Sequence, residues 1–265
     1  MKILIGGTGK MGSLIKDTAQ AGGNIVTGMV DAFDLSPLDT MEIPDVLIDF
    51  SHRDNLGWIV DYAVKNHVPV VYGTTGLTEQ DHSALQKLSE QVPVFYSTNF
   101  SYGVAVLNEL VRRATALLKD NYDMELVETH HNEKKDAPSG TAKTLLSIMN
   151  ESGEFTPVYG RQGDVGARGK EIGVHSLRGG TEAGEHTVHY FGNNETITIS
   201  HRATNRVIFV NGALKAADYL IKQSAGMYGM KDLIGYKEGS RNDQNRYFRL
   251  WKSRQRNRMC GSCSE

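Results

Sequence analysis

The fold of this 265-residue chain is decided by its first stretch, Lys2-Ile3-Leu4-Ile5-Gly6-Gly7-Thr8-Gly9-Lys10-Met11-Gly12. It opens as a short run of aliphatic side chains, typical of a buried strand, and ends in a cluster of glycines. Apolar side chains then recur at helical spacing from Leu14 to Ala19. The order strand, glycine turn, helix is the first unit of an open parallel α/β sheet.

The next eighty residues repeat this alternation. Apolar runs at 25–30, 46–48, 68–72 and 92–96 predict strands, and segments with helical period at 56–64 and 77–88 predict helices between them. Strands that alternate with helices at this pace indicate a parallel sheet covered on both faces.

The pattern changes near Phe100. Residues 104–118 predict a long helix, 124–129 a strand, and 130–138 a polar loop that leads into a helix at Ser139. Glycine-rich, alternating segments at 172–177, 186–191 and 196–200 predict further strands, and 207–221 a closing helix. The sequence therefore predicts an α/β chain with an N-terminal Rossmann-type dinucleotide-binding domain and a second α+β domain built on a mostly open mixed sheet.

The glycine turn predicts a dinucleotide cofactor. Gly7-x-Gly9-x-x-Gly12 lies between a predicted strand and helix, where backbone N–H groups and the helix N-terminus bind pyrophosphate. Asp31 ends the second strand and would accept hydrogen bonds from the adenosine ribose, which favours NADH because a 2′-phosphate would be repelled. Lys10 leaves NADPH open. The full set expected around the cofactor is Gly6, Gly7, Thr8, Gly9, Lys10, Met11, Gly12, Asp31, Gly73, Thr74, Thr75, Ser97, Thr98, Asn99 and Phe100, the last two groups being loops at strand ends.

A second polar segment, 128–142, reads Glu-Thr-His-His-Asn-Glu-Lys-Lys-Asp-Ala-Pro-Ser-Gly-Thr-Ala. Two histidines and two lysines crowd the loop, which suits an anionic substrate. Ser139 is a good N-cap, so the N–H groups of Gly140 and Thr141 would be free to hold a carboxylate. We expect no metal, because the histidine pair lacks a third ligand at a suitable sequence spacing.

This segment resembles the signature of the 4-hydroxy-tetrahydrodipicolinate reductase family, and the resemblance extends over about residues 1–235. It implies reduction of 4-hydroxy-tetrahydrodipicolinate to tetrahydrodipicolinate by hydride transfer from NAD(P)H, in diaminopimelate and lysine biosynthesis. It further implies that His130 and Lys134 carry the proton-transfer step. The two substrate carboxylates would be held by His131, Gly140, Thr141 and Arg206.

The resemblance also implies a division of the chain and an assembly. Residues 1–100 with 206–235 would form the dinucleotide-binding domain, and 101–205 a substrate-binding domain whose open sheet pairs across subunits in a homotetramer. Two alternatives remain at this stage. One is an aspartate or sugar dehydrogenase on the same plan, and the other a non-catalytic regulator that senses nicotinamide.

Charge separates the chain into two parts. Residues 236–265 carry eight basic and three acidic side chains, a net charge of +5, and residues 1–235 carry 21 basic and 28 acidic ones, a net charge of −7. The acidic body indicates no nucleic-acid partner. Because both cysteines, Cys260 and Cys263, lie in the basic tail, the body is free of thiols, as is typical of the cytoplasm.

The tail itself is expected to be a flexible, solvated extension. Its Cys-x-x-Cys pair is a weak metal signal, and aromatic residues between its arginines leave a nucleic-acid or membrane contact open for the tail alone. No apolar stretch of the chain approaches the ~20 residues that span a bilayer, so we expect neither a membrane protein nor secretion.

Overall fold

The computed structural model describes residues 1–235. One half of the structure, formed by the N-terminal residues and by the last described strand, is built on a six-stranded parallel sheet with strand order β11-β5-β4-β3-β1-β2. The strands are β1 (Lys2–Gly6), β2 (Ile25–Val30), β3 (Val46–Asp49), β4 (Val70–Tyr72), β5 (Pro93–Tyr96) and β11 (Gly226–Tyr228). The predicted Rossmann-type sheet is therefore confirmed. The tail from 236 onwards, with all expectations for it, lies outside the described residues.

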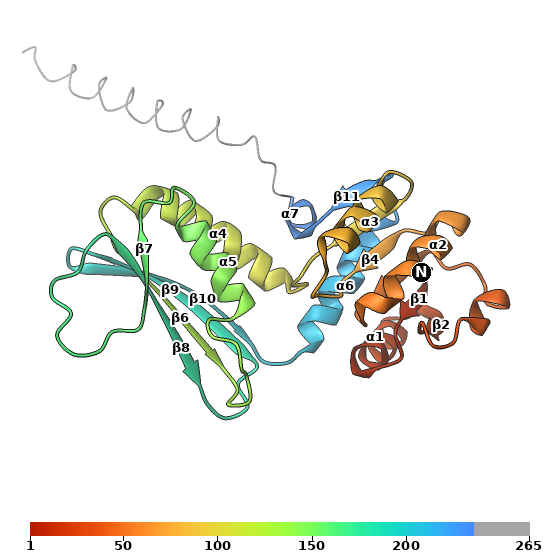
Figure 1. Ribbon diagram of the computed structural model, residues 1–265, viewed down its shortest axis with the longest axis horizontal. Coiled ribbons are helices and arrows are strands. Elements are labelled where there is room, and N and C mark those ends of the chain that lie inside the picture. Colours follow the sequence, from red (N-terminus) through yellow and green to blue (C-terminus); the bar gives the residue numbers. More distant parts are fainter. Residues whose placement is uncertain (236–265) are drawn as a thin grey trace, which may run out of the picture.

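Helices cover both faces of this sheet (Figure 1). They are α1 (Lys10–Ala21), α2 (Leu56–Asn66), α3 (Glu79–Ser89) and α6 (Val207–Leu220), with short 3₁₀ turns η1 (Ser36–Asp39) and η2 (Arg53–Asn55). Alternate side chains of each strand point to opposite faces, so Leu4 and Leu47 join the core under α2 and α3, whereas Ile3 and Ile48 join the core under α1 and α6. This explains why the strands read as continuous apolar runs.

The second half is a five-stranded mixed sheet with strand order β10-β9-β6-β8-β7. Its strands are β6 (Asp123–His130), β7 (Thr156–Tyr159), β8 (Glu171–Arg178), β9 (Gly184–Gly192) and β10 (Glu195–Ala203). Strands β6, β7 and β8 run parallel, whereas β9 pairs antiparallel with both β6 and β10. Helices α4 (Tyr102–Leu118) and α5 (Gly140–Met149) cover one face only (Figure 1), which confirms the predicted open mixed sheet.

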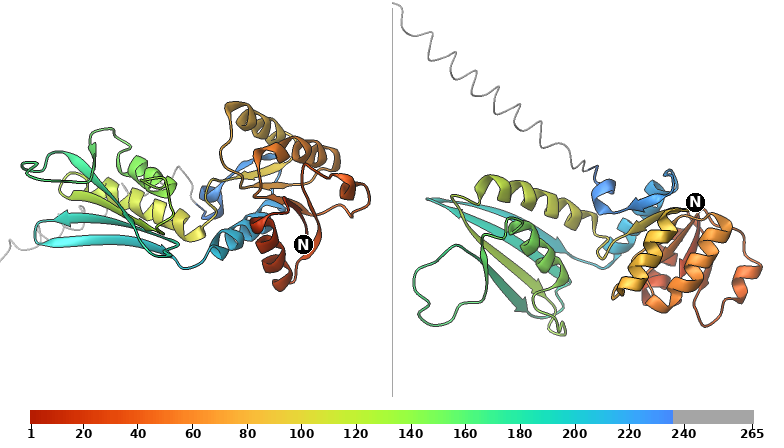
Figure 2. Two further views of the ribbon diagram at one scale, coloured as in Figure 1. Left: turned by 60° about the horizontal axis from the view of Figure 1, so that its bottom comes forward. Right: turned by 45° about the horizontal axis from the view of Figure 1, so that its top comes forward.

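The chain crosses between the two halves twice, before α4 and between β10 and α6 (Figure 2). Gly212 in α6 packs against the backbone at the first crossing, because a Cβ there would overlap the carbonyl oxygen of Phe100. Asn99 reaches the other half directly and donates a hydrogen bond from Nδ2 to Thr141 Oγ1 over 3.1 Å. The start of α5 is thereby tied to the carboxyl edge of the parallel sheet.

Three short elements were not expected from the sequence. Strands β7 and β11 are edge strands of three or four residues, too short for an alternating pattern to show, and α7 (Met230–Leu233) is a single turn after β11. Across residues 1–235, none of the helices combines the length and apolarity that crossing a membrane requires.

Candidate functional site

The glycine turn after β1 has the shape of a phosphate cradle. Gly7 adopts φ +90°, and a Cβ on Gly12 would lie 2.2 Å from the carbonyl oxygen of Gly7, so the turn is closed tightly on its inner side. On the outer side Gly9 is exposed, and a Cβ there would meet nothing within 4 Å. Gly9 is the N-cap of α1 and offers no side-chain cap, so the first amides of the helix stay available. These residues fit a dinucleotide pyrophosphate.

The strand register brings the other expected cofactor segments to the same edge. Gly6 pairs with Val30 and with Asp49, Asp49 pairs with Tyr72, and Tyr72 pairs with Tyr96. Asp31, the loop 73–75 and the loop 97–100 therefore follow neighbouring strand ends. Within these segments Thr75 and Thr98 are exposed, and Thr74 and Phe100 are buried.

The histidine–lysine loop leaves the end of β6 and lies against the turn between β8 and β9. The N–H of Asn132 donates to Gly180 O over 3.2 Å, and that of Gly179 donates to His130 O over 3.0 Å. Lys134 is mostly buried and pairs through Nζ with Asp136 Oδ1 at 2.7 Å. His131 is half-buried beside it.

Glu128 is the centre of this site, although the sequence did not mark it as a functional residue. Its carboxylate has no solvent exposure and accepts two hydrogen bonds from Arg178, of 2.8 and 3.0 Å. It also accepts the N–H of Ser139 over 3.2 Å and lies 2.5 Å from Nδ1 of His130. Four donors on three chain segments thus converge on one carboxylate.

Electrostatics fix the protonation of this pair. Burial alone would raise the pKa of Glu128, but hydrogen bonds from Arg178, Ser176 and His130 outweigh it and lower the pKa to about 2. Burial, together with the positive charges of Lys134 and Arg178, lowers the pKa of His130 although the Glu128 carboxylate opposes the shift. Since an ionised carboxylate only accepts, Nδ1 of His130 carries the proton, and Nε2 of the neutral ring is left as an acceptor. Gly184 lies close to this ring: a Cβ there would be 3.0 Å from that Nε2, and its φ of +148° also favours glycine.

His186 contacts the N-cap residue of α5, Ser139. Its Nε2 lies 2.8 Å from Ser139 Oγ, which itself accepts the N–H of Ala142 over 3.2 Å. Burial, with the nearby His130 ring as a further cause, lowers the pKa of His186 to about 4, so the ring is neutral at pH 7. Within residues 1–235 the amides of Gly140 and Thr141 have no acceptor, so they are available to an anion; the carboxylate site itself stays a prediction.

Pairing across strands explains why Glu128, Arg178 and His186 meet. In the register of β6, residue 128 lies opposite His186 of β9, and residue 130 opposite Arg178 of β8. Glu128, His130 and His186 each place one potential ligand atom within 4.8 Å of the others, a set of metal-ligand type that the sequence spacing did not reveal. The Glu128 oxygens and His186 Nε2 are already hydrogen-bonded, to Arg178, His130 and Ser139.

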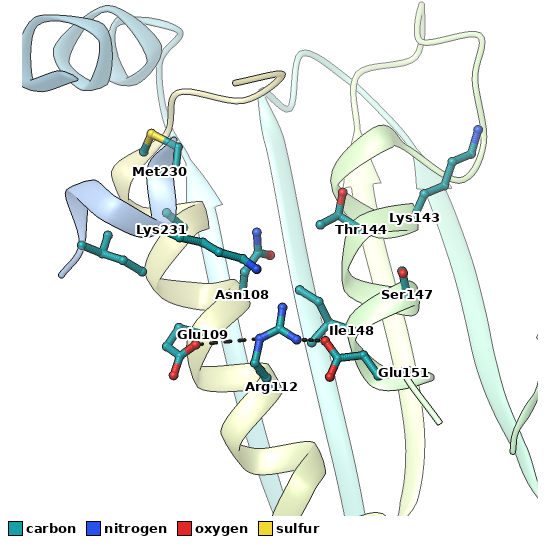
Figure 3. A pocket seen from close by; sticks show the side chains of 12 residues that line it. Asn108, Glu109, Arg112, Lys143, Thr144, Ser147, Ile148, Glu151, Met230 and Lys231 are labelled. Atoms are coloured by element: carbon teal, nitrogen blue, oxygen red, sulfur yellow. Dashed lines mark ion pairs between the residues drawn. The ribbon is translucent and has the colours of Figure 1, made fainter. Parts of the chain in front are cut away.

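Arg206 is placed differently from the loop residues. It is exposed immediately before α6, and no side-chain hydrogen bond of the described residues joins it to the segment 128–142. A separate groove of about 480 Å³ lies between α4, α5 and α7 (Figure 3). Arg112 spans it through ion pairs with Glu109 and Glu151, and its lining includes none of the expected site residues.

Comparisons with known proteins identify the family of the chain. Family models described as dihydrodipicolinate reductase, N-terminus and C-terminus, match residues 1–100 and 103–234. The 4-hydroxy-tetrahydrodipicolinate reductase of Brachyspira hyodysenteriae is 41% identical over 237 residues, which cover 88% of this chain and 100% of the relative. The enzyme of the same name from Methanoregula boonei is 42% identical over 249 residues, with 88% and 97% covered.

A solved structure has the same fold. The dipicolinate-bound dihydrodipicolinate reductase from Paenisporosarcina sp. TG-14 superimposes with a TM-score of 0.71 at 22% identity and covers 88% of this chain and 98% of its own. A probable dehydrogenase from Thermotoga maritima follows with a TM-score of 0.55 at 10% identity. The two-part architecture therefore also occurs in a solved dihydrodipicolinate reductase.

Proposed function

The chain belongs to the dihydrodipicolinate reductase family, and from this premise we propose that the loop from His130 to Lys134 holds the proton-transferring groups of its reaction. The activity is the NAD(P)H-dependent reduction of 4-hydroxy-tetrahydrodipicolinate to tetrahydrodipicolinate, in diaminopimelate and lysine biosynthesis. When bound, the reduced nicotinamide supplies a hydride to an unsaturated ring carbon. One proton is taken up, and the 4-hydroxyl group leaves as water.

Lys134 is the better proton source at neutral pH. A lysine ammonium is charged there, attracts a dicarboxylate and has a proton to give, and Asp136 holds Nζ in place at 2.7 Å. His130 is held neutral with its proton on Nδ1 toward Glu128, so its Nε2 accepts a hydrogen bond from the substrate or relays a proton to it. The two groups therefore act together at one end of the ring.

The start of α5 is the carboxylate-binding part of the proposal. The free amides of Gly140 and Thr141 and the positive end of the helix favour an anion, and His131 lies on the adjoining loop. Arg206 would bind the second carboxylate, and we propose that the two halves approach each other when the substrate binds. Asn99, bonded to Thr141, links that motion to the cofactor edge.

The cofactor proposal rests on the edge of the parallel sheet. Gly6 to Gly12 would hold the pyrophosphate, Asp31 the adenosine ribose, and the loops 73–75 and 97–100 the nicotinamide end. We propose a preference for NADH, because Asp31 is followed by Ala32 and Phe33 and not by a cation for a 2′-phosphate.

The domain division and the assembly are also proposals. Residues 1–100 with 206–235 would bind the cofactor, and 101–205 the substrate. The uncovered face of the second sheet carries exposed Leu177 and Phe191, which supports its burial in a homotetramer. The cysteine-free body supports a cytoplasmic location.

The observation that carries the proposal is the convergence of His130, Lys134 and the free start of α5 on one loop. The test supplies the full chain with the product of dihydrodipicolinate synthase, made in the cuvette, and follows the loss of NADH or NADPH absorbance. Cofactor oxidation should require both this substrate and the chain. Turnover of L-aspartate or a sugar with oxidised cofactor instead, or no reaction with either reduced cofactor, would refute the proposed function.

A further inference from the structure

A row of mostly buried, hydrogen-bonded polar side chains, the polar chain of Asp49, Ser51, Thr74 and Asn55, lies at the carboxyl ends of β3 and β4. None of the reaction steps given above uses it. It starts at Asp49, the last residue of β3, which has no solvent exposure. Its carboxylate accepts hydrogen bonds from the hydroxyl groups of Ser51 and Thr74, the latter at 2.6 Å. The backbone N–H of Ser51 donates to the same Thr74 hydroxyl over 2.9 Å. The side chain of Thr74 is thus engaged by protein on both sides.

Asn55 extends the polar chain toward the end of β2. It is 1% exposed, and its Nδ2 donates to Ser51 Oγ over 2.6 Å. Its Oδ1 accepts two hydrogen bonds, from the backbone N–H of Ala32 over 2.6 Å and from Trp58 Nε1 over 2.7 Å. One side-chain amide thereby fixes the backbone immediately after Asp31.

The glycine turn packs on the same residues. A Cβ on Gly6 would lie 2.6 Å from Asp49 Oδ1, and a Cβ on Gly7 would lie 2.4 Å from the Cβ of Ser51. Asp49 and Ser51 therefore form the floor under the phosphate cradle. The polar chain touches three of the four segments proposed for cofactor binding: the glycine turn, the Asp31 end of β2 and the loop 73–75.

We propose that Asn55 is a positioning residue for the adenosine end of the cofactor, acting through Ala32 on the carboxylate of Asp31. This inference rests on the proposed function of the turn and of Asp31. Asn55 does not contact the ligand, since it is buried between Ser51, Ala32 and Trp58. Its removal leaves the N–H of Ala32 without its acceptor and frees the backbone that aims Asp31.

The consequence is specific to one dinucleotide. A correctly placed Asp31 accepts the 2′-hydroxyl of NADH, whereas NADPH has a phosphate at that position and gains nothing from the carboxylate. Loss of Asn55 should thus weaken NADH binding more than NADPH binding. A purely structural role would weaken both equally.

The experiment titrates NADH and NADPH into the full chain without substrate and follows nicotinamide fluorescence. Asn55→Ala should raise the Kd for NADH about tenfold, the effect of losing one buried hydrogen bond, and raise that for NADPH less than about threefold. The amide of Ala32 should exchange with deuterium faster in the variant. Trp58→Phe is the matched control, because it removes the other donor to the same oxygen and leaves the Ala32 bond intact, so both Kd values should stay within about twofold.

An unchanged ratio of the two Kd values in Asn55→Ala would overturn the inference, whether both rise or neither does. Should that variant not fold, Ser51→Ala interrupts the same chain on the other side of Asn55 and is judged by the same ratio. Failure of the wild-type chain to bind either dinucleotide would instead refute the proposed cofactor site. Tighter binding of NADPH by the wild type would refute only the NADH preference.

Discussion

Glu128 Oε2 lies 2.5 Å from Nδ1 of His130, and the carboxylate that makes this contact has no solvent exposure. Glu128 occupies the last position of a buried row on β6 that begins with Met124 and Leu126. A charge at the end of an apolar row is costly unless it is paired, and here the guanidinium of Arg178 pairs it. The loop that follows β6, proposed to be catalytic, is therefore anchored to the hydrophobic core through the Glu128 carboxylate.

Glu128→Gln should reduce both stability and turnover. The amide cannot pair with Arg178, and breaking a largely buried ion pair costs about 3 kcal/mol in the free energy of unfolding. Since the tautomer of His130 is no longer fixed, kcat should fall about tenfold or more. Urea unfolding and steady-state rates measure the two effects.

The control for this variant is Glu182→Gln. Glu182 pairs with Arg202, which is well exposed, so its loss should change the stability far less than Glu128→Gln does and leave kcat unchanged. Equal effects of the two substitutions would contradict the anchoring role of Glu128.

Two glycines of the turn should respond differently to alanine. Gly12→Ala forces a Cβ within 2.2 Å of the Gly7 carbonyl and should destabilise the fold by about 1–3 kcal/mol. Gly9→Ala meets nothing within 4 Å and has an ordinary φ of −78°, so stability should change by less than about 1 kcal/mol. Its methyl group would nevertheless occupy the space through which the pyrophosphate approaches, and NADH affinity should fall about tenfold.

Thermal unfolding and dinucleotide titration of both variants give the comparison. A Gly9→Ala chain that binds NADH as the wild type does would show that the phosphate lies elsewhere.

The sequence predicted those parts of the fold and site that depend on local pattern. Continuous apolar runs located the strands of the parallel sheet except β11, alternating segments located most strands of the mixed sheet, and period-3.6 spacing located the helices except α7. The Ser139 cap and the free amides of α5 follow from capping chemistry within four residues. The glycine turn was likewise predicted from a pattern within a few consecutive residues, Gly7 to Gly12.

The remainder depends on strand register, which one sequence does not reveal. Glu128 meets Arg178 across 50 residues, and the pairing of β6 with β8 and β9 had to be known before that contact was evident. The Asn55 chain was missed for the same reason, because it joins residues 23 positions apart through a short 3₁₀ turn.

Asp49→Asn should change how stability depends on pH. Burial raises the pKa of Asp49 to about 6, although hydrogen bonds from Ser51 and Thr74 oppose the shift. The folded state therefore binds more protons than the unfolded state between about pH 4 and pH 6, and the wild type loses stability as pH rises through this window. The asparagine variant lacks that loss, so relative to the wild type it should gain about 2 kcal/mol between pH 4 and pH 7.

Urea unfolding of the wild type and the variant at each pH tests the sign of this difference in stability. Glu125 and Glu128 contribute the same pH dependence to the free energy of unfolding of both proteins, so their contributions cancel. Parallel stability curves would mean that the carboxyl group of Asp49 titrates in the folded state as it does in the unfolded chain.

Lys134→Ala should abolish turnover while cofactor binding persists. Lys134 lies on the loop after β6 that we propose binds the substrate, with Nζ held by Asp136, whereas the proposed cofactor segments all follow strands of the other sheet. Losing the proton donor should lower kcat by about 10²- to 10⁴-fold, and the Kd for NADH should change less than about twofold. Lys135→Ala is the matched control, because Lys135 is the exposed neighbour of Lys134 and its substitution removes the same charge from the same loop. Stopped-flow rates and dinucleotide titration separate the alternatives: if both lysine variants lose activity alike, the loop attracts the dicarboxylate by its net charge, and if neither does, the proton comes from another group.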